Sequence, residues 1–229
     1  MKGAEVQLSI VVPCYNEEGS LERVVRDAHR VAKDAVGRFE IIIVNDQSAD
    51  RSPEIADRLA RELSAVRVVH HPVNRGFGAA FSTGLEAAAY EFLILIPGDA
   101  QFPAEDIRRL LVHAEADIVV GYRLDRGDPV RRRITSTILF FVMFFVFRVP
   151  LRDINWVKLY RRKALLEIKP SFTGIGIDAQ IVVGAARRGF RFAQTQVGYL
   201  PRTTGQSTGD DPKRVRQTLR EIFRLWWRS

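Results

Sequence analysis

The sequence contains a single cysteine, Cys14, among its 229 residues. One thiol excludes an internal disulfide and any metal site built from several cysteines, and it is consistent with a reducing compartment. Cys14 follows Pro13 at the end of an expected strand, and we do not expect it to act as a nucleophile. Histidine is also scarce, with four residues, and we expect all four to be structural. The chain therefore has little material for thiol or imidazole catalysis.

Long apolar segments are missing as well. The N-terminal stretch MKGAEVQLS lacks the apolar core of a signal peptide. No run reaches the roughly 20 apolar residues that a membrane-spanning helix needs. We therefore expect a cytoplasmic protein, peripheral on the cytoplasmic face of a membrane where it meets one.

Two common phosphate-binding motifs are absent too. The sequence has no G-x-x-x-x-G-K-[ST], which argues against an ATPase of that type. Gly76 and Gly78 open an expected helix, but Phe81 stands where a dinucleotide fingerprint has its third glycine. We expect these glycines to allow close packing instead.

Positive charge and apolar residues are abundant. Lysine and arginine outnumber the acidic residues by 35 to 27, for a net charge of +8. This excess indicates an anionic partner, namely nucleic acid, anionic lipid or a phosphorylated substrate, with a merely basic surface as the alternative. Hydrophobic residues make up 46% of the chain, enough to bury the core of one domain.

Strand and helix patterns alternate along the first half, with short links between them. This alternation predicts an α/β fold with a parallel sheet covered on both faces. The expected strands are Val6–Val12, Phe39–Val44, Val66–His70, Phe92–Ile96 and Asp117–Val120. The expected helices are Glu18–Val36, Ser52–Leu63 with Ser52 as N-cap, Gly76–Tyr90 and Pro103–Ala114. After Gly121 we expect a helix near Asp178–Arg188 and a strand near Phe190–Val197.

Polar side chains follow three of the expected strands. They lie in VVPCYNEE (Val11–Glu18), in VNDQSAD (Val44–Asp50) and at Asp99 and Gln101 after LILIPG. Parallel strands bring their carboxyl ends to one edge, where open α/β sheets bind ligands. The oxygens of Asp99 and Gln101 suit a hard divalent cation carrying a diphosphate. Helix caps and turns are the alternative, since Asp, Asn and Ser favour those places.

The ordered series of motifs resembles glycosyltransferase family 2, specifically the polyprenyl-phosphate sugar synthases similar to dolichol-phosphate mannose synthase. The series continues through NRGFGAAFSTGLEAA, GDAQFPAED, GYR, DINWVKLYRR and YLPRTTGQS, and thus covers most of the chain. The resemblance implies a GT-A fold, a Rossmann-like and mostly parallel sheet with helices on both faces. We expect a single domain over residues 1–209, with a nucleotide-binding half (1–121) and an acceptor half (122–209). Residues 210–229 are expected to form a basic amphipathic helix.

The resemblance also implies an activity and its residues. The activity is inverting transfer of a sugar from a nucleotide diphosphate sugar, such as GDP-mannose or a UDP-sugar, to dolichyl or undecaprenyl phosphate, with Mg²⁺ or Mn²⁺ as cofactor. The nucleotide sugar would be held by Pro13, Tyr15, Glu17, Val44, Asp46, Gly98 and Asp99. The metal would be held by Asp99 and Gln101, and the acceptor phosphate by Arg123, Arg131, Arg202 and Ser207. The catalytic candidates are Asp99, Arg123 and Asp153.

The sequence departs from the family pattern at three places. Pro97 occupies the first position of the family's Asp-x-Asp-x-Gln metal motif, where it cannot ligate a metal. Asn45-Asp46 keeps one charge of the usual acidic pair, and DINWVK is one residue shorter than usual and lacks its glycine. One alternative is therefore a catalytically weakened membrane adaptor that retains nucleotide binding.

The chemistry of the acceptor separates the remaining alternatives. A phosphate acceptor is already ionised at neutral pH and needs no strong general base. Transfer to a soluble or glycan hydroxyl would need one, and Asp153 is the candidate. Aspartate in a turn before a strand is an equally ordinary structural feature.

Two segments predict contact with an anionic membrane surface. Residues Ile134–Phe147 carry no charge and are flanked by arginines. This segment is too short to span a bilayer, but it is suited to the bilayer interface. A core helix is the alternative. The tail has an apolar stripe with basic residues around it, which also fits docking on an oligomer partner or a membrane-anchoring subunit. The stripe consists of Val215, Leu219, Ile222, Phe223 and Trp226.

Nucleic acid is not expected as a partner, because the basic residues flank apolar segments and form no stacked aromatic platform.

Overall fold

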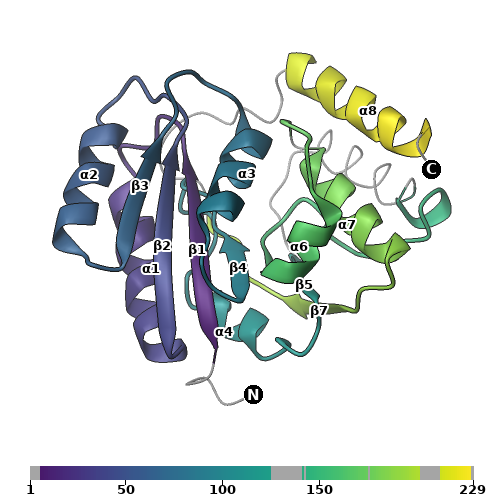
Figure 1. The fold of residues 1–229 in the computed structure, drawn as a ribbon, viewed down its shortest axis with the longest axis horizontal. Coiled ribbons are helices and arrows are strands. Elements are labelled where there is room, and N and C mark those ends of the chain that lie inside the picture. The colour runs from purple at the N-terminus through teal and green to yellow at the C-terminus, as the bar shows by residue number, and fades with distance from the viewer. Residues whose placement is uncertain (1–5, 125–140, 142, 175, 202–211, 228–229) are drawn as a thin grey trace.

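The computed structural model describes residues 6–124, 141, 143–174, 176–201 and 212–227. In this part of the chain, seven strands form one sheet in the order β3-β2-β1-β4-β6-β5-β7 (Figure 1). The strands are β1 (Gln7–Cys14), β2 (Arg38–Asn45), β3 (Val66–His70), β4 (Phe92–Leu95), β5 (Ile118–Tyr122), β6 (Lys158–Arg161) and β7 (Phe192–Gln196).

The sheet is mostly parallel, as predicted. Strand β1 runs parallel to β2 and β4, β2 runs parallel to β3, and β5 runs parallel to β7. Strand β6 is antiparallel to both of its neighbours, β4 and β5. A strand after Asp153 was named only as an alternative and without bounds, because the four residues KLYR show no apolar run or clear alternation. Since β6 comes from the second half of the chain, one sheet runs through both halves.

The helices follow the predicted order with shifted ends. Helix α6 was not predicted, and α3 and α4 are shorter than expected. The helices are α1 (Leu21–Ala35), α2 (Ser52–Glu62), α3 (Phe77–Ala87), α4 (Asp106–Leu111), α6 (Arg162–Ile168), α7 (Ile177–Arg187) and α8 (Pro212–Trp227). The prediction of Ser52 as N-cap is wrong. The helix begins at Ser52 without a side-chain cap, and the Ser52 Oγ accepts the Glu17 N–H at 2.9 Å.

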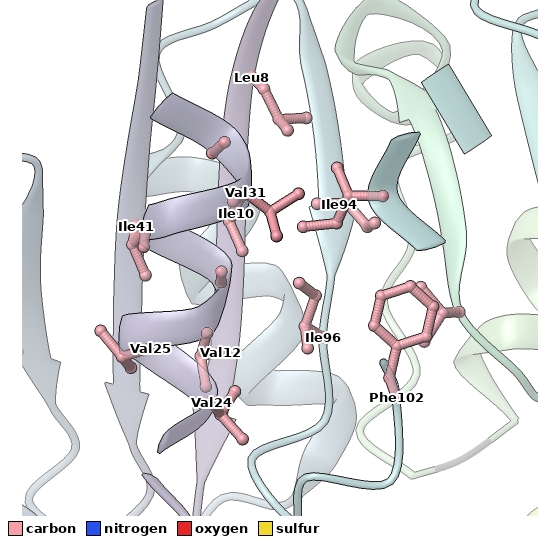
Figure 2. Close-up of a cluster of buried hydrophobic side chains, with 14 of the residues drawn as sticks. Leu8, Ile10, Val12, Val24, Val25, Val31, Ile41, Ile94, Ile96 and Phe102 are labelled. Atoms are coloured by element: carbon pink, nitrogen blue, oxygen red, sulfur yellow. The ribbon is translucent and has the colours of Figure 1, made fainter. Parts of the chain in front are cut away.

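Side chains alternate between two buried layers. On one face, Val24, Val25 and Val31 of α1 pack over Ile10 and Ile41 of the central strands (Figure 2). The opposite face carries the intervening strand residues beneath α3, α6 and α7, among them Val11, Ile42 and Leu93. Each such side chain contributes about 1.5–3 kcal/mol when fully buried. Burial on both faces explains why these strands are continuously apolar.

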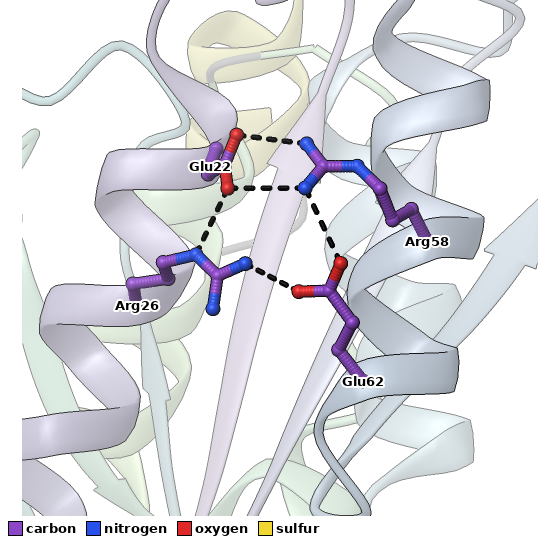
Figure 3. Close-up of polar contacts among 4 residues, drawn as sticks. All are labelled: Glu22, Arg26, Arg58 and Glu62. Carbon is purple, nitrogen blue, oxygen red and sulfur yellow. Dashed lines mark hydrogen bonds and ion pairs between the residues drawn. The ribbon is translucent and has the colours of Figure 1, made fainter.

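Helices α1 and α2 are joined by a network of ion pairs on their exposed sides (Figure 3). Glu22 accepts hydrogen bonds from Arg58 Nη2 at 2.8 Å and from Arg26 Nε at 2.9 Å. Arg26 and Arg58 also pair with Glu62. The hydrogen bonds from the two arginines lower the pKa of Glu22 from 4.5 to about 2.

The C-terminal helix α8 packs against α7 (Figure 1). Glu221 and Leu225 of α8 are buried, whereas Phe223 is 58% exposed and Trp227 is 76% exposed. The Glu221 carboxylate accepts the N–H groups of Gly174 and Gly176, each at 3.1 Å. The helix thus docks on its own chain through a face centred on Glu221 and Leu225. Phe223 of the predicted apolar stripe points away from that face.

The described part of the segment before residue 148 likewise has one buried side and one exposed side. Met143 is buried in the second layer, whereas Phe141, Phe144 and Phe145 are exposed, Phe145 by 70%. Among the described residues, no helix has both the length and the apolar character needed to cross a membrane.

Candidate active site

The carboxyl ends of β2, β1 and β4 lie side by side at one edge of the sheet, as predicted. Cys14 at the end of β1 is paired with Asn45 at the end of β2. On the other side, the Ile96 N–H after β4 donates to the Val11 carbonyl at 2.9 Å. The motifs that follow these strands are therefore brought to one crevice by the sheet order.

Each of the three strands is followed by a non-glycine residue in the left-handed region. The φ angles of Asn16, Gln47 and Ala100 are 57°, 60° and 59°. Such conformations cost on the order of 1 kcal/mol each and are found preferentially where a ligand is held. The first two loops also hold each other, because Asn16 N–H donates to Ser48 Oγ at 3.0 Å and Asn16 Oδ1 accepts Ala49 N–H at 2.8 Å.

The close approach of β1 and β4 depends on Gly98. A Cβ atom at this position would lie 2.8 Å from the Pro13 carbonyl oxygen and 3.6 Å from Glu17 Cγ. Pro13, Glu17 and Gly98, three of the predicted nucleotide-binding residues, are thus brought together. Tyr15 in the same loop is 42% exposed, and Val44 is fully buried in β2. An exposed tyrosine at this edge is free to lie against a planar ring.

Asp46 is engaged within the protein. Its carboxylate accepts the N–H groups of Arg75 and Gly76, both at 2.8 Å, and lies 2.7 Å from His71 Nδ1. The other ring nitrogen of His71 is 2.9 Å from Thr83 Oγ1. Asp46 therefore holds the turn that leads into α3, and its part in nucleotide binding stays a prediction. His71 is structural, as expected.

Cys14 is buried beneath the same edge, with 1% of its surface exposed. Burial raises the pKa of its thiol to about 11. A thiol of this kind is protonated at neutral pH and inert, which agrees with the expectation that Cys14 is no nucleophile.

Asp99 and Gln101 offer few oxygen atoms to a cation. Asp99 is buried, and its Oδ1 accepts the Gln101 N–H at 3.1 Å. The Gln101 Nε2 donates to the Tyr199 hydroxyl at 2.7 Å, so Oε1 is the amide atom that could face a cation. Within the described residues, no group of three or more His, Cys, Asp and Glu side chains could hold a metal. One carboxylate and one amide nevertheless fit Mg²⁺ or Mn²⁺ where a substrate supplies phosphate oxygens, because Mg²⁺ uses few protein ligands in such sites.

Arg123 and Asp153 face each other on the other side of Tyr199. Arg123 Nε and Nη2 donate to the two carboxylate oxygens of Asp153 at 2.9 and 3.3 Å. The guanidinium carbon also lies 4.0 Å from the ring centre of Trp156 and 5.3 Å from that of Tyr199. Of the other predicted acceptor residues, Arg131, Arg202 and Ser207 lie outside the described residues.

A second buried ion pair, between Lys158 and Asp178, lies next to the cluster of Arg123, Asp153 and Trp156. Lys158 of β6 donates through Nζ to Asp178 Oδ1 at 2.6 Å and to the Trp156 carbonyl at 2.8 Å. Burial raises the pKa of Asp178, against the opposing effect of Lys158, and it also raises the pKa of Tyr160. The pair anchors the turn that carries Asp153 and Trp156.

No role was predicted for Trp156, Lys158, Asp178 or Tyr199, although three of them lie within the motifs DINWVKLYRR and YLPRTTGQS. Lysine in a short strand is typical of an exposed edge, whereas Lys158 is buried in the middle of the sheet. Trp156 and Tyr199 could have been found from the aromatic residues of DINWVKLY and YLP, taken together with the excess of arginine in the sequence. Aromatic rings bind guanidinium groups through their faces.

The proteins that this chain resembles in sequence are glycosyltransferases. The family model described as Glycosyl transferase family 2 matches residues 9–171. Glycosyltransferase AglD of Haloferax volcanii is 29% identical over 98% of this chain, which spans 38% of that protein. An undecaprenyl-phosphate 4-deoxy-4-formamido-L-arabinose transferase of Pseudomonas aeruginosa is 32% identical over 87% of this chain and 59% of its own length. The chain thus spans less than two thirds of the length of each of these two relatives.

Solved structures share the fold. Glucosyl-3-phosphoglycerate synthase from Mycobacterium tuberculosis, crystallised with Mn²⁺, uridine diphosphate and glucosyl-3-phosphoglycerate, superimposes with a TM-score of 0.76. The alignment covers 96% of this chain and 80% of that one at 21% sequence identity. The likeness establishes the GT-A fold, and the Mn²⁺ and nucleotide belong to the relative.

Proposed function

The chain belongs to glycosyltransferase family 2, and on this premise we propose that it transfers a sugar from a nucleotide diphosphate sugar to a polyprenyl phosphate. The proposal is supported by the relative named as an undecaprenyl-phosphate transferase. The observation that carries it is the continuous cluster from Asp99 and Gln101 through Tyr199 to Arg123. This cluster combines a metal–diphosphate end with a cationic end, as two phosphorylated substrates require.

The donor end consists of the loops after β1, β2 and β4. Tyr15 lies exposed beside Pro13 and Glu17, and the packing at Gly98 keeps these residues next to Asp99. Asp99 and Gln101 would hold Mg²⁺ or Mn²⁺ together with the donor's phosphates. When bound, this cation neutralises the charge that develops on the departing diphosphate.

The acceptor end is built around Arg123. Two of its five N–H donors are used by Asp153, and the remaining donors are suited to a phosphate oxygen. Its stacking on Trp156 keeps the guanidinium in place without a further acceptor. Arg131, Arg202 and Ser207 are proposed to add contacts to the same phosphate.

The proposed transfer is a single displacement. An oxygen of the acceptor phosphate attacks the anomeric carbon, and the bond from this carbon to the donor's β-phosphate oxygen breaks. The nucleoside diphosphate leaves with the electron pair, and the anomeric configuration is inverted. No proton has to be removed from the acceptor, because a phosphate monoester is ionised at neutral pH.

One observation favours phosphate over a hydroxyl acceptor. Both oxygens of Asp153 accept hydrogen bonds from Arg123, and the side chain is 3% exposed. A general base needs an available lone pair within reach of the substrate proton. Asp153 is better placed to orient Arg123 than to deprotonate a sugar or glycan hydroxyl, which remains the second candidate acceptor.

We also propose that the reaction takes place at the cytoplasmic surface of a membrane. The exposed aromatic residues Phe141, Phe144, Phe145, Phe223 and Trp227 offer apolar contacts at a lipid interface. Arg148, Arg220 and Arg224 are exposed beside them, and each basic residue near an anionic leaflet adds about 1 kcal/mol. A membrane-anchoring subunit or a second copy of the chain could use the same aromatic surface.

The test is a panel of radiolabelled nucleotide sugars incubated with a short polyprenyl phosphate and either Mg²⁺ or Mn²⁺. We expect one donor to give a lipid-extractable product that requires the cation. The unphosphorylated polyprenol serves as the acceptor control, and Asp99→Asn as the enzyme control. Transfer to polyprenol at an equal rate would favour the hydroxyl reaction. Undiminished turnover by Asp99→Asn would remove the metal role.

A further inference from the structure

Tyr199 lies between the two ends of the candidate site and contacts both. Its hydroxyl accepts a hydrogen bond from Gln101 Nε2 at 2.7 Å. Its ring meets Trp156 edge to face, with 5.7 Å between centroids, and the guanidinium carbon of Arg123 lies 5.3 Å from the ring centre. We propose that Tyr199 is a positioning residue, whose hydroxyl orients Gln101 for the metal and whose ring supports Arg123 for the acceptor phosphate. This inference rests on the proposed function.

The hydroxyl decides which end of the Gln101 amide is presented. A glutamine amide can rotate so that its oxygen and nitrogen exchange places, at little cost in free energy, unless its hydrogen bonds distinguish the two atoms. A cation accepts only Oε1 as a ligand, so Nε2 then needs an acceptor of its own. The phenol oxygen of Tyr199 meets this need, in the way that neighbouring groups fix the ligands of a metal site.

The backbone holds Tyr199 and Gln101 in register. The Leu200 N–H donates to the Gln101 carbonyl at 2.9 Å, and the Gly198 N–H donates to Asp106 Oδ2 at 2.5 Å. A Cβ at Gly198 would lie 2.9 Å from Pro103 Cγ, so glycine allows the two segments to approach. The contact between Tyr199 and Gln101 is therefore supported by backbone hydrogen bonds between their two loops and does not depend on the two side chains alone.

The ring acts on the other end of the site. Together with Trp156 it provides aromatic surface beside the Arg123 guanidinium, which Asp153 holds from another direction. Removing the hydroxyl while keeping the ring should therefore disturb the metal and spare the phosphate. Removing the whole ring should disturb both. The two functions of Tyr199 can be separated by two substitutions at this position.

The experiment compares the wild-type chain with Tyr199→Phe and Tyr199→Leu. Binding of Mn²⁺ is followed by electron paramagnetic resonance in the presence of uridine or guanosine diphosphate, independently of turnover. We expect Tyr199→Phe to weaken Mn²⁺ binding about tenfold, a magnitude typical for loss of a group that orients a metal ligand. Its KM for polyprenyl phosphate should stay unchanged. Tyr199→Leu should weaken Mn²⁺ binding equally and also raise that KM.

Tyr90→Phe is the matched control, because Tyr90 precedes β4 at the opposite edge of the sheet. It should bind Mn²⁺ as the wild type does. Equal Mn²⁺ binding by wild type and Tyr199→Phe overturns the inference while leaving the proposed function standing. Failure of the wild type to bind Mn²⁺ with either nucleotide overturns the metal site itself, and the role of the hydroxyl with it. If Mn²⁺ binding responds as expected but no sugar reaches any lipid, the proposed function fails and the role of the hydroxyl stands.

Discussion

Arg123 and Asp153 form a two-pronged ion pair, with Nε–Oδ2 and Nη2–Oδ1 distances of 2.9 and 3.3 Å. Thirty residues separate them in the chain, and the turn after β5 meets the turn before β6 to bring them together. Both side chains are largely buried, and the ring of Trp156 covers one face of the guanidinium. In the proposed site, this arrangement makes Arg123 a rigid cation and Asp153 the group that aims it.

Replacing Asp153 by asparagine separates the two acceptor classes. Asparagine keeps the shape and one acceptor oxygen, so Arg123 stays near its place. If the acceptor is a phosphate, we expect a loss of less than about tenfold, because no proton is removed by Asp153. If Asp153 is a general base, the loss should be about 10²–10⁴-fold. Initial rates with polyprenyl phosphate decide between these outcomes, and thermal melting confirms that the variant is folded.

Glu221 is expected to hold α8 on the body of the protein. Glu221→Ala leaves the N–H groups of Gly174 and Gly176 without their acceptor, at a cost of about 1–3 kcal/mol. The free energy of unfolding in urea measures this loss. Arg220→Ala is the matched control, since Arg220 lies exposed on the same helix. A Glu221→Ala variant as stable as Arg220→Ala would contradict the docking role.

Glu22 should make stability depend on pH in the acid range. Its folded pKa of about 2 lies below the ordinary value of 4.5, so the unfolded chain binds more protons between these values. The stabilisation is fully present above about pH 4.5 and is lost as the pH falls toward about 2. The difference in melting temperature between wild type and Glu22→Gln should therefore be constant near neutral pH and shrink below 4.5. A difference that does not change across this range would contradict the assignment.

The exposed aromatics of α8 are expected to bind anionic vesicles. Phe223 and Trp227 are stacked with 6.4 Å between ring centroids and are exposed by 58% and 76%. Inserting one such side chain into lipid gains about 1.5–3 kcal/mol. The double substitution Phe223→Ala and Trp227→Ala should therefore reduce vesicle partitioning by about tenfold or more.

Sedimentation with vesicles containing phosphatidylserine measures this partitioning. Val112→Ala, which alters an exposed apolar residue beyond the C-terminal end of α4, is the control and should sediment as the wild type does. Equal sedimentation by the double variant would assign the aromatic surface to a protein partner or to solvent.

The central sheet could be predicted because its strands are apolar on both faces. The runs around Ile10, Ile42 and Ile94 are long enough to stand out, and polar loops at their ends mark where each one stops. Strand β6 could not be predicted in this way. Its four residues include Lys158, and a buried lysine is stabilised only by a partner, Asp178, twenty residues away.

The proposed metal ligands and the proposed acceptor arginine could likewise be named before the fold was known. Asp99, Gln101 and Arg123 lie in motifs whose residue types already indicate their chemistry. Tyr199 and Trp156 carry no such mark, since aromatic residues fill cores throughout the chain. Their place beside Gln101 and Arg123 arises from contacts between segments separated by as many as 98 positions.

The alternation of elements, the parallel pairing of the central strands and the edge at which polar loops meet could all be inferred from the sequence. These features depend on the periodicity of each segment and on the alternation of strands and helices along the chain, which the sequence displays directly. The folded molecule was needed to show that Asp46 braces a turn, that Asp153 is paired with Arg123 and that Tyr199 contacts both Gln101 and Arg123. A carboxylate, a guanidinium or a phenol has several possible partners of similar energy, and the one it meets is set by how distant segments pack.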